Sequence, residues 1–311
     1  MNYKIIFNII GFLLILTGLL MLPGIAFSVY YGHSDIVSIL TSSLITIISG
    51  LVIYFLTKNA NKHQLGKREG YLIVTLGWIV ISTFGSIPFL IHGSIPSVTD
   101  AFFETMSGFT TTGASILTDI EKLPAGLLFW RSMTQWIGGM GIIVLSLAIM
   151  PLLGIGGMQL FSAEVPGITK DKFHPRVKET AKRLWGIYVI LTVAETILLM
   201  IGGLTFFDAI NHSLTTMATG GFSTKNASTA HFDNPFVQYV FIIFMFFAGM
   251  NFALHYFLLH WKFDVLKKNS EFKFYLSFII ISTLIIMFIH RPHHTFDAEE
   301  SFRQTLFHVI S

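Results

Sequence analysis

The sequence predicts an all-α, polytopic membrane protein in which tandem helix–pore-loop–helix units follow two extra transmembrane helices. Three observations predict this fold class. Hydrophobic residues make up 53% of the 311 residues and charged residues 12%, about half the charged fraction of a soluble domain. Seven apolar runs are each about as long as a helix that crosses a bilayer. A glycine-bearing segment that cannot cross the membrane occurs twice between such runs.

The apolar runs predict transmembrane helices, and the first of them contains Pro23. Proline removes a backbone donor inside a helix, so we expect a kink at this residue. The chain has no cysteine, which excludes disulfide scaffolds, thiolate zinc sites and thiol nucleophiles. The predicted spans are residues 5–31, 36–57, 71–92, 127–150, 184–204, 236–260 and 274–290.

The basic residues are concentrated in alternate loops. Lys4 and the segments 58–68, 161–183 and 262–273 together contain 15 of the 20 lysine and arginine residues. The positive-inside rule therefore places these segments and the N-terminus in the cytoplasm. Ten of the 17 acidic residues lie in the opposite segments, where they would either concentrate cations at an outer mouth or only be solvated. The net charge of +3 is too small to indicate nucleic-acid binding.

An internal repeat organises the chain. Residues 100–115 align with residues 208–223 without a gap, and Gly113 falls on Gly221. A third copy begins after the last apolar run and stops at Ser311, six residues before its expected filter glycine, so we expect the sequence to be part of a longer protein. The repeat predicts two extra helices (1–68), a first pore-loop unit (69–160), a cytoplasmic linker (161–183), a second pore-loop unit (184–262) and an incomplete third unit (263–311).

Each repeated segment predicts a short helix followed by a turn inside the membrane. We expect Asp100 and Asp208 to be the N-caps of these helices, whose partially negative C-termini would then face a cation. Irregular backbone at membrane depth is tolerated only where it is buried in protein or lines a water-filled cavity. The threonine- and glycine-containing residues that follow are suited to presenting backbone carbonyls, as the filters of potassium channels do.

One such segment alone would more simply be an ordinary turn. Two segments in register, each inside a helix–turn–helix unit of matching topology, favour a pore.

Further segments carry a resemblance to a known family. They are residues 131–141, 157–161, 166–172, 248–256 and 302–307. Together with the two repeated segments, they resemble the Trk/Ktr superfamily of potassium transporters, and within it the membrane subunit of Trk uptake systems, over the whole chain. The resemblance implies four pseudo-symmetric pore-loop units, a bacterial inner-membrane location and a homodimer on a cytoplasmic ring of TrkA-like, nucleotide-binding regulatory subunits. It also implies K⁺ as the bound ion, surrounding membrane lipid and no organic cofactor in this chain.

By matching position, the resemblance also implies the residues that coordinate the ion. They are Thr110, Thr111, Thr112 and Gly113 in the first unit, and Ala218, Thr219, Gly220 and Gly221 in the second. Within these segments we expect ligands from the backbone carbonyls of Thr111, Thr112, Thr219 and Gly220. We expect Gly113 and Gly221 to set the turns.

The function expected from these observations is potassium translocation by a Trk-type subunit that is not an enzyme. One alternative is a secondary carrier for another cation or a small solute, with its substrate bound at broken helices. That alternative would predict inverted repeats, whereas these repeats run in the same orientation. A membrane-embedded enzyme such as a protease would need a buried nucleophile–base pair, and the sequence shows none at the expected depth.

Other polar residues have less specific interpretations. Glu195 is the sole acidic residue inside an apolar span, where it would either pair with a neighbouring helix or be protonated. We expect Arg131 and Lys122 to extend to the outer membrane interface. The linker 161–183 is expected to be a docking surface for the regulatory ring rather than a solvated connector.

Two clusters have a structural explanation that we prefer. The histidines 290, 293 and 294 favour a membrane-boundary cluster over a metal site, because no fourth ligand is evident. The glycines 138, 139 and 141 favour close packing of helices over a hinge.

Overall fold

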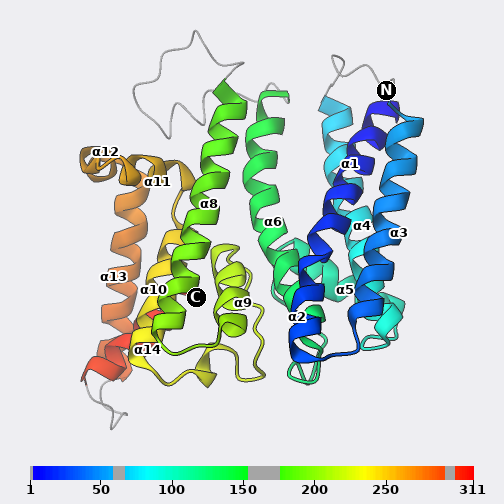
Figure 1. Cartoon of the computed structure of the whole chain (residues 1–311). Helices are drawn as coiled ribbons and strands as arrows, with labels where there is room; N and C mark the ends of the chain where they lie inside the picture. The colour runs from blue at the N-terminus through cyan, green and yellow to red at the C-terminus, as the bar shows by residue number, and fades with distance from the viewer. Residues whose placement is uncertain (1–2, 59–66, 153–175, 291–297) are drawn as a thin grey trace.

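The computed structural model describes residues 3–58, 67–152, 176–290 and 298–311, and all regular secondary structure in these ranges is helical. Figure 1 shows long helices side by side, with the short helices α5 and α9 in the lower half of the bundle. The elements are α1 (Tyr3–Met21), α2 (Pro23–Tyr31), α3 (Ile36–Leu56), α4 (Lys67–His92), α5 (Val98–Phe109), α6 (Ala125–Leu152), α8 (Arg176–Ile201), α9 (Phe206–Met217), the 3₁₀ helix η1 (Ser228–His231), α10 (Pro235–Gly249), α11 (Phe252–Leu259), α12 (Phe263–Lys268), α13 (Ser270–His290) and α14 (Ala298–Ile310). The prediction of an all-α protein is confirmed.

Several helices present apolar side chains to their surroundings. Within the described residues, five helical stretches are long and apolar enough to cross a membrane. In α13 only 11% of the most apolar window is buried, and Phe278, Ile285 and Phe288 are exposed. A continuous apolar surface of this kind is stable in lipid rather than in water. The chain is therefore a multi-pass membrane protein.

The first span is kinked at Pro23, as predicted. α1 ends at Met21 and α2 begins at Pro23, with a single residue between the two helices. Proline has no backbone N–H and its ring crowds the preceding turn, so a regular helix cannot pass through it unchanged.

Small residues bring α1 and α3 into backbone contact. A Cβ atom on Gly11 would lie 2.8 Å from the Tyr54 backbone nitrogen, and one on Gly50 would lie 2.7 Å from the Gly11 carbonyl oxygen. The Ser43 hydroxyl donates a hydrogen bond to the Gly18 carbonyl at 2.7 Å. Helices in lipid associate through such close packing because burial of apolar surface gives them little driving force. The two N-terminal spans therefore form a tight pair.

The loop between α2 and α3 fastens this pair to the first pore-loop unit. A carboxylate oxygen of Asp35 accepts a hydrogen bond from the Leu127 amide at 3.0 Å, and His33 Nδ1 accepts one from the Ala125 amide at 2.8 Å. Both amides belong to the first turn of α6, whose N–H groups have no acceptor within the helix. An acidic side chain also stabilises the positive end of the helix dipole. The loop thereby fixes the start of α6.

The predicted span 236–260 is not one helix. α10 ends at Gly249, Met250 has extended backbone, and α11 begins at Phe252. A Cβ atom on Gly249 would lie 2.7 Å from the Tyr275 hydroxyl oxygen of α13, so α13 closely approaches the chain at the break. The same hydroxyl donates a hydrogen bond to the Phe246 carbonyl at 3.3 Å, which supplies one of the missing donors.

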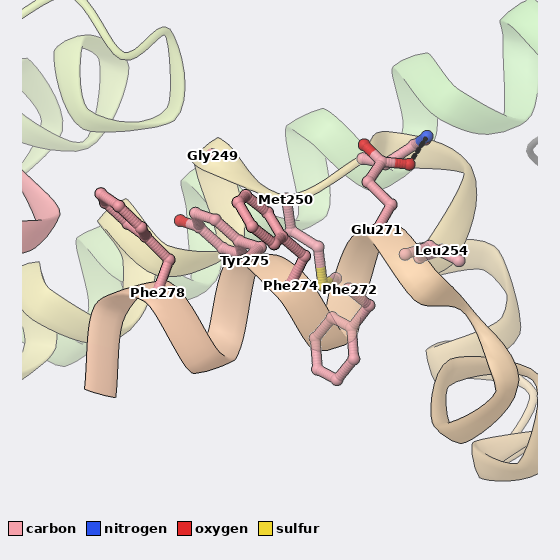
Figure 2. Close-up of a pocket in the computed structure, with 9 residues that line it drawn as sticks. Gly249, Met250, Leu254, Glu271, Phe272, Phe274, Tyr275 and Phe278 are labelled. Carbon is pink, nitrogen blue, oxygen red and sulfur yellow. Dashed lines mark hydrogen bonds between the residues drawn. The ribbon is translucent and has the colours of Figure 1, made fainter. Parts of the chain in front are cut away.

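A pocket of about 240 Å³ lies between this break and α13. Figure 2 shows its apolar lining, with the Phe274, Tyr275 and Phe278 rings on α13 and Met250 at the break. At one end, the Asn251 side-chain amide donates a hydrogen bond to the Glu271 carboxylate at 3.2 Å.

Candidate functional site

The short helices α5 and α9 begin with a hydroxyl cap and not with an aspartate. Ser97 Oγ accepts a hydrogen bond from the Asp100 amide at 3.3 Å, and Thr205 Oγ1 accepts one from the Asp208 amide at 3.1 Å. The prediction that the two aspartates are N-caps was therefore wrong, because both lie three residues inside the cap. A hydroxyl at the first position of this spacing reaches the third amide of the helix, while the carboxylate complements the positive helix end.

The first short helix ends in a Schellman motif. The Thr111 amide donates to the Gly108 carbonyl at 3.0 Å, and the Thr112 amide donates to the Ser107 carbonyl at 2.9 Å. These two bonds close the last turn of α5 and satisfy carbonyls that have no partner within the helix. The chain then leaves the helix through the candidate filter segment.

The second short helix ends in the same way, at the equivalent residues. The Thr219 amide donates to the Thr216 carbonyl at 2.9 Å, and the Gly220 amide donates to the Thr215 carbonyl at 2.9 Å. The repeat found in the sequence is therefore also a repeat of backbone hydrogen bonds.

Each candidate filter segment contains two residues with positive φ. In the first unit they are Thr111 (φ 54°) and Gly113 (φ 76°), and in the second they are Thr219 (φ 52°) and Gly221 (φ 79°). Glycine adopts this conformation freely, but a β-branched residue rarely does. Left-handed backbone costs a non-glycine residue about 1–2 kcal/mol. Strain of this kind is typical of functional sites, where the surrounding protein maintains it.

The first residues of the two segments cap their helices. The Thr110 hydroxyl donates to the Met106 carbonyl at 2.8 Å and lies 2.8 Å from the Thr112 hydroxyl. Ala218 is buried against α6, where a Cβ atom on Gly139 would lie 2.9 Å from its Cα atom. Further along, the segments open to the surroundings, and the exposed residues are Thr112, Thr219 and Gly221.

The two candidate filter segments touch each other. A Cβ atom on Gly113 would collide with the carbonyl oxygen of Gly220, so the backbones of the two segments are in direct contact at these residues. That oxygen also accepts a hydrogen bond from Gln135 Nε2 at 2.7 Å. Of the four carbonyls expected to face an ion, the one of Gly220 is thus held by a side chain of α6.

A buried ion pair lies behind the first segment. Arg131 Nε donates to Glu104 Oε1 at 2.7 Å, and both side chains are no more than 2% exposed. The same carboxylate accepts hydrogen bonds from the Ser115 hydroxyl and the Ile116 amide, each at 3.0 Å. Glu104 therefore fastens the segment that follows the first candidate filter segment to α5 and α6.

The expected position of Arg131 at the membrane interface was wrong. Its guanidinium lies 3.5 Å from the centre of the Phe222 ring, and its Nη1 atom donates to the Ser223 carbonyl at 3.1 Å. A buried cation needs a counter-charge and acceptors, and Glu104 with Ser223 supplies them. Lys122, in contrast, is exposed and pairs with Asp119 at 2.9 Å.

Histidine replaces glutamate in the second unit. His212 Nε2 lies 2.9 Å from the Ser223 hydroxyl, and its Nδ1 lies 2.8 Å from the Asp208 carbonyl. The Asp208 carboxylate accepts a hydrogen bond from the Thr224 hydroxyl at 2.6 Å and lies 3.6 Å from Lys225 Nζ. The segment that follows the second candidate filter segment is thus also fastened to the short helix α9.

The loops that follow the two candidate filter segments are joined by Asn226. Its side chain accepts a hydrogen bond from the Ile120 amide at 2.7 Å and donates one to Asp119 at 3.0 Å, while its own amide donates to Glu121 at 3.0 Å. Hydrogen bonds from Asn226 and then Lys122 lower the pKa of Asp119, and Asp119 in turn raises the pKa of Lys122.

The remaining candidates are not part of the candidate filter segments. Glu195 is fully buried in α8, with Thr216 of α9 as its polar neighbour. A Cβ atom on Gly138 would collide with the Phe109 carbonyl group, so this glycine allows close helix packing. The described residues contain no group of three or more histidine, aspartate or glutamate side chains that could hold a metal ion. His293, His294 and most of the linker 161–183 lie outside the described residues.

A family model described as "TrkH: Cation transport protein" matches residues 36–289. The chain belongs to the TrkH family. It is 42% identical to the Trk system potassium uptake protein TrkH of Salmonella typhimurium and 41% identical to that of Escherichia coli. Both alignments cover the whole chain and 65% of the relative, so the chain spans about two thirds of the length of these proteins.

A solved TrkH structure has the same fold. The crystal structure of the potassium transporter TrkH from Vibrio parahaemolyticus matches with a TM-score of 0.86 and 38% sequence identity. The match covers 100% of this chain and 64% of the solved chain. Membership of the TrkH family and this fold agree with the resemblance seen in the sequence.

Sequence reasoning missed the side chains that hold the candidate filter segments in place. On α6, Gln135 binds Gly220 of the second candidate segment and Arg131 binds Ser223 just after it, and nothing in the linear sequence indicates this crossing. A signal for Glu104 and His212 was available, because the alignment of the repeats pairs them and also pairs Ser115 with Ser223.

Proposed function

We propose that this chain forms the membrane-embedded, ion-translocating part of a Trk-type potassium uptake system and catalyses no covalent reaction. K⁺ is its transported substrate. It would pass the backbone carbonyls of residues 110–113 and 218–221, with the carbonyls of Thr111, Thr112 and Thr219 as the principal ligands and Gly220 in a supporting position. Relatives named Trk system potassium uptake protein support the choice of ion.

The observation that carries the proposal is the matched geometry of the two segments. Each short helix ends in the same pair of hydrogen bonds, followed by a threonine and a glycine with positive φ. Helix C-termini carry partial negative charge, and residues with positive φ turn the neighbouring carbonyls away from the direction that they have in a helix. Two such segments would supply part of the ring of oxygens that surrounds a dehydrated cation in a carbonyl filter.

The arrangement around the filters is part of the same proposal. We retain the division into an N-terminal pair (1–68), pore-loop units (69–160 and 184–262), a linker (161–183) and part of a third unit (263–311). The N-terminus and the basic loops face the cytoplasm of a bacterial inner membrane. The whole protein is a homodimer in lipid, bound to a cytoplasmic ring of TrkA-like nucleotide-binding subunits, as the family resemblance implies.

Two glycines that have nearly the same φ angle and the same free space around a Cβ atom provide the test. Gly221 in the second filter has φ 79° and Gly93 after α4 has φ 78°, and a Cβ atom on either would meet nothing within 4 Å. A serine at either position would therefore carry the same local strain of about 1–2 kcal/mol. Only the one at Gly221 would move a filter carbonyl.

The full-length protein with Gly221→Ser or Gly93→Ser would be reconstituted in liposomes, and K⁺ and Na⁺ uptake measured. We expect unaltered protein to prefer K⁺, Gly93→Ser to keep that preference, and Gly221→Ser to lose most of it. Equal preferences in all three proteins would show that residues 218–221 are not a filter.

A further inference from the structure

Gln135 is a fully buried side chain of the first unit that binds the filter of the second unit. Its Nε2 atom donates to the Gly220 carbonyl at 2.7 Å, and its Oε1 atom accepts from the Phe222 amide at 3.1 Å. The two bonds fix the orientation of the amide, because the reverse orientation would face donor with donor and acceptor with acceptor. The Gln135 residue itself is 0% exposed.

The two bonds enclose Gly221, the residue with the greatest conformational freedom in the segment. One bond holds the peptide group before Gly221 and the other holds the peptide group after it. Glycine can rotate both of its torsions at little steric cost, and a Cβ atom here would meet nothing within 4 Å. The orientation of both peptide groups therefore depends on a partner outside the segment, and Gln135 is that partner.

The close approach of the amide requires the glycine at position 220. A Cβ atom there would lie 2.8 Å from Gln135 Nε2 and would collide with the rest of the amide group. The held carbonyl also lies against Gly113 of the first filter. Gln135 thus sets the position of the second filter relative to the first, as well as its internal shape.

The helix α6 also holds the residues that follow Phe222. Arg131, one turn earlier on α6, donates to the Ser223 carbonyl at 3.1 Å. The single glutamine of α10, Gln238, donates instead to the Phe232 carbonyl at 2.9 Å. The amide bridge is therefore a feature of α6 and not a general feature of the repeat.

We propose that Gln135 is a positioning residue for ion selectivity, whose amide holds the Gly220–Gly221 peptide in the orientation that favours K⁺ over Na⁺. This inference rests on the proposed function of residues 218–221 as a filter. Without the bridge, the peptide can rotate and turn a different group toward the ion. Selectivity then falls even though the helices remain in place.

The test uses three variants of the full-length protein. Gln135→Leu removes both hydrogen bonds at similar volume, and Gln135→Glu keeps the acceptor for Phe222 but loses the donor to Gly220. Thr192→Val is the matched control, because it removes a buried hydrogen bond between α8 and Trp136, the neighbour of Gln135 on α6, at 3.1 Å. The readouts are the K⁺ to Na⁺ affinity ratio, from ion-dependent thermal stabilisation, and the thermal stability without either ion.

We expect the affinity ratio to fall about tenfold in Gln135→Leu, which corresponds to the loss of about one hydrogen bond of selective stabilisation. Gln135→Glu should also lower the ratio, and Thr192→Val should lower thermal stability alone. An unchanged ratio in a folded Gln135→Leu or Gln135→Glu protein would overturn the inference, as would failure of both variants to fold, which would make Gln135 a structural residue. If unaltered protein shows no preference for K⁺, the proposed function fails instead.

Discussion

Glu104 on α5 and His212 on α9 occupy the same position in the two short helices, and each binds the serine that follows its own candidate filter segment. Glu104 accepts from Ser115 at 3.0 Å, and His212 Nε2 lies 2.9 Å from Ser223. The two units thus use different chemistry for the same attachment. Only the glutamate needs a counter-ion, and Arg131 supplies it.

Neutralising Glu104 should destabilise the protein strongly. Glu104→Gln retains an acceptor for Ser115 but leaves Arg131 as an unpaired buried cation, and breaking a buried pair in this way costs about 3–5 kcal/mol. The measurement is thermal unfolding of the purified protein in detergent. Glu104→Gln combined with Arg131→Met should be more stable than Glu104→Gln alone, and equal stability of the single variant and unaltered protein would contradict the role of the pair.

Adding a methyl group at Gly138 should disrupt the contact between α6 and the end of α5. A Cβ atom there would collide with the Phe109 carbonyl group, and overpacking typically costs about 1–3 kcal/mol. Gly141→Ala is the control, because a Cβ atom at Gly141 has its nearest neighbour, Trp78, at 3.7 Å. The yield of monodisperse protein on size exclusion should fall for Gly138→Ala and not for Gly141→Ala. A normal yield for both would mean that the helices can separate freely.

The chain contains no cysteine, so single cysteines can report the orientation in the membrane. We expect a membrane-impermeant thiol reagent added to intact cells to label Ala227→Cys and to spare Lys58→Cys, because both residues are exposed but lie on opposite sides by the distribution of basic residues. Lysis should make Lys58→Cys reactive. Labelling of Lys58→Cys in intact cells would reverse the assignment.

The stability that the bridge through Asn226 provides should depend on pH. Asn226 and Lys122 lower the pKa of Asp119 below its ordinary value of 3.8, so the ionised carboxylate stabilises the folded state. This contribution is complete above the ordinary pKa and disappears as pH falls through the lowered pKa of the folded state.

Thermal stability measured against pH tests this linkage. Asp119→Asn should be less stable than unaltered protein at neutral pH, and the difference should shrink below pH ~4. Asp233→Asn, at another exposed external aspartate, is the control and should show no comparable loss at neutral pH. A difference that grows in acid would have the wrong sign for a stabilising carboxylate.

Local patterns in the sequence predict much of this fold, because helices in lipid are specified by length and apolarity. The kink at Pro23 and the repeat of the two pore-loop segments were visible in the same way. The pattern Ser97-x-x-Asp100 also contains the true helix cap, which is the hydroxyl of Ser97 and not the carboxylate of Asp100. The break after Gly249 was not predicted, and it lies beside Tyr275 of a later helix, a contact that the linear sequence does not show.

The candidate site was predictable only in part. Positive φ at Gly113 and Gly221 follows from the nature of glycine, whereas positive φ at Thr111 and Thr219 opposes the preference of threonine. The burial of Arg131 depends on Glu104 and on Ser223, which lies 92 residues later in the chain. Such features arise from the tertiary arrangement and leave no periodic pattern in the sequence.

The left-handed threonines have a consequence for engineering. Thr111 and Thr219 adopt a conformation that their own side chains disfavour. The shape of each candidate filter segment is therefore maintained by α6 and by the following segments, which bind Glu104 and His212. Grafting the four residues 110–113 into another pore loop would transfer their sequence but not their backbone conformation. A transplant that keeps its conformation must also carry the partners that hold it there.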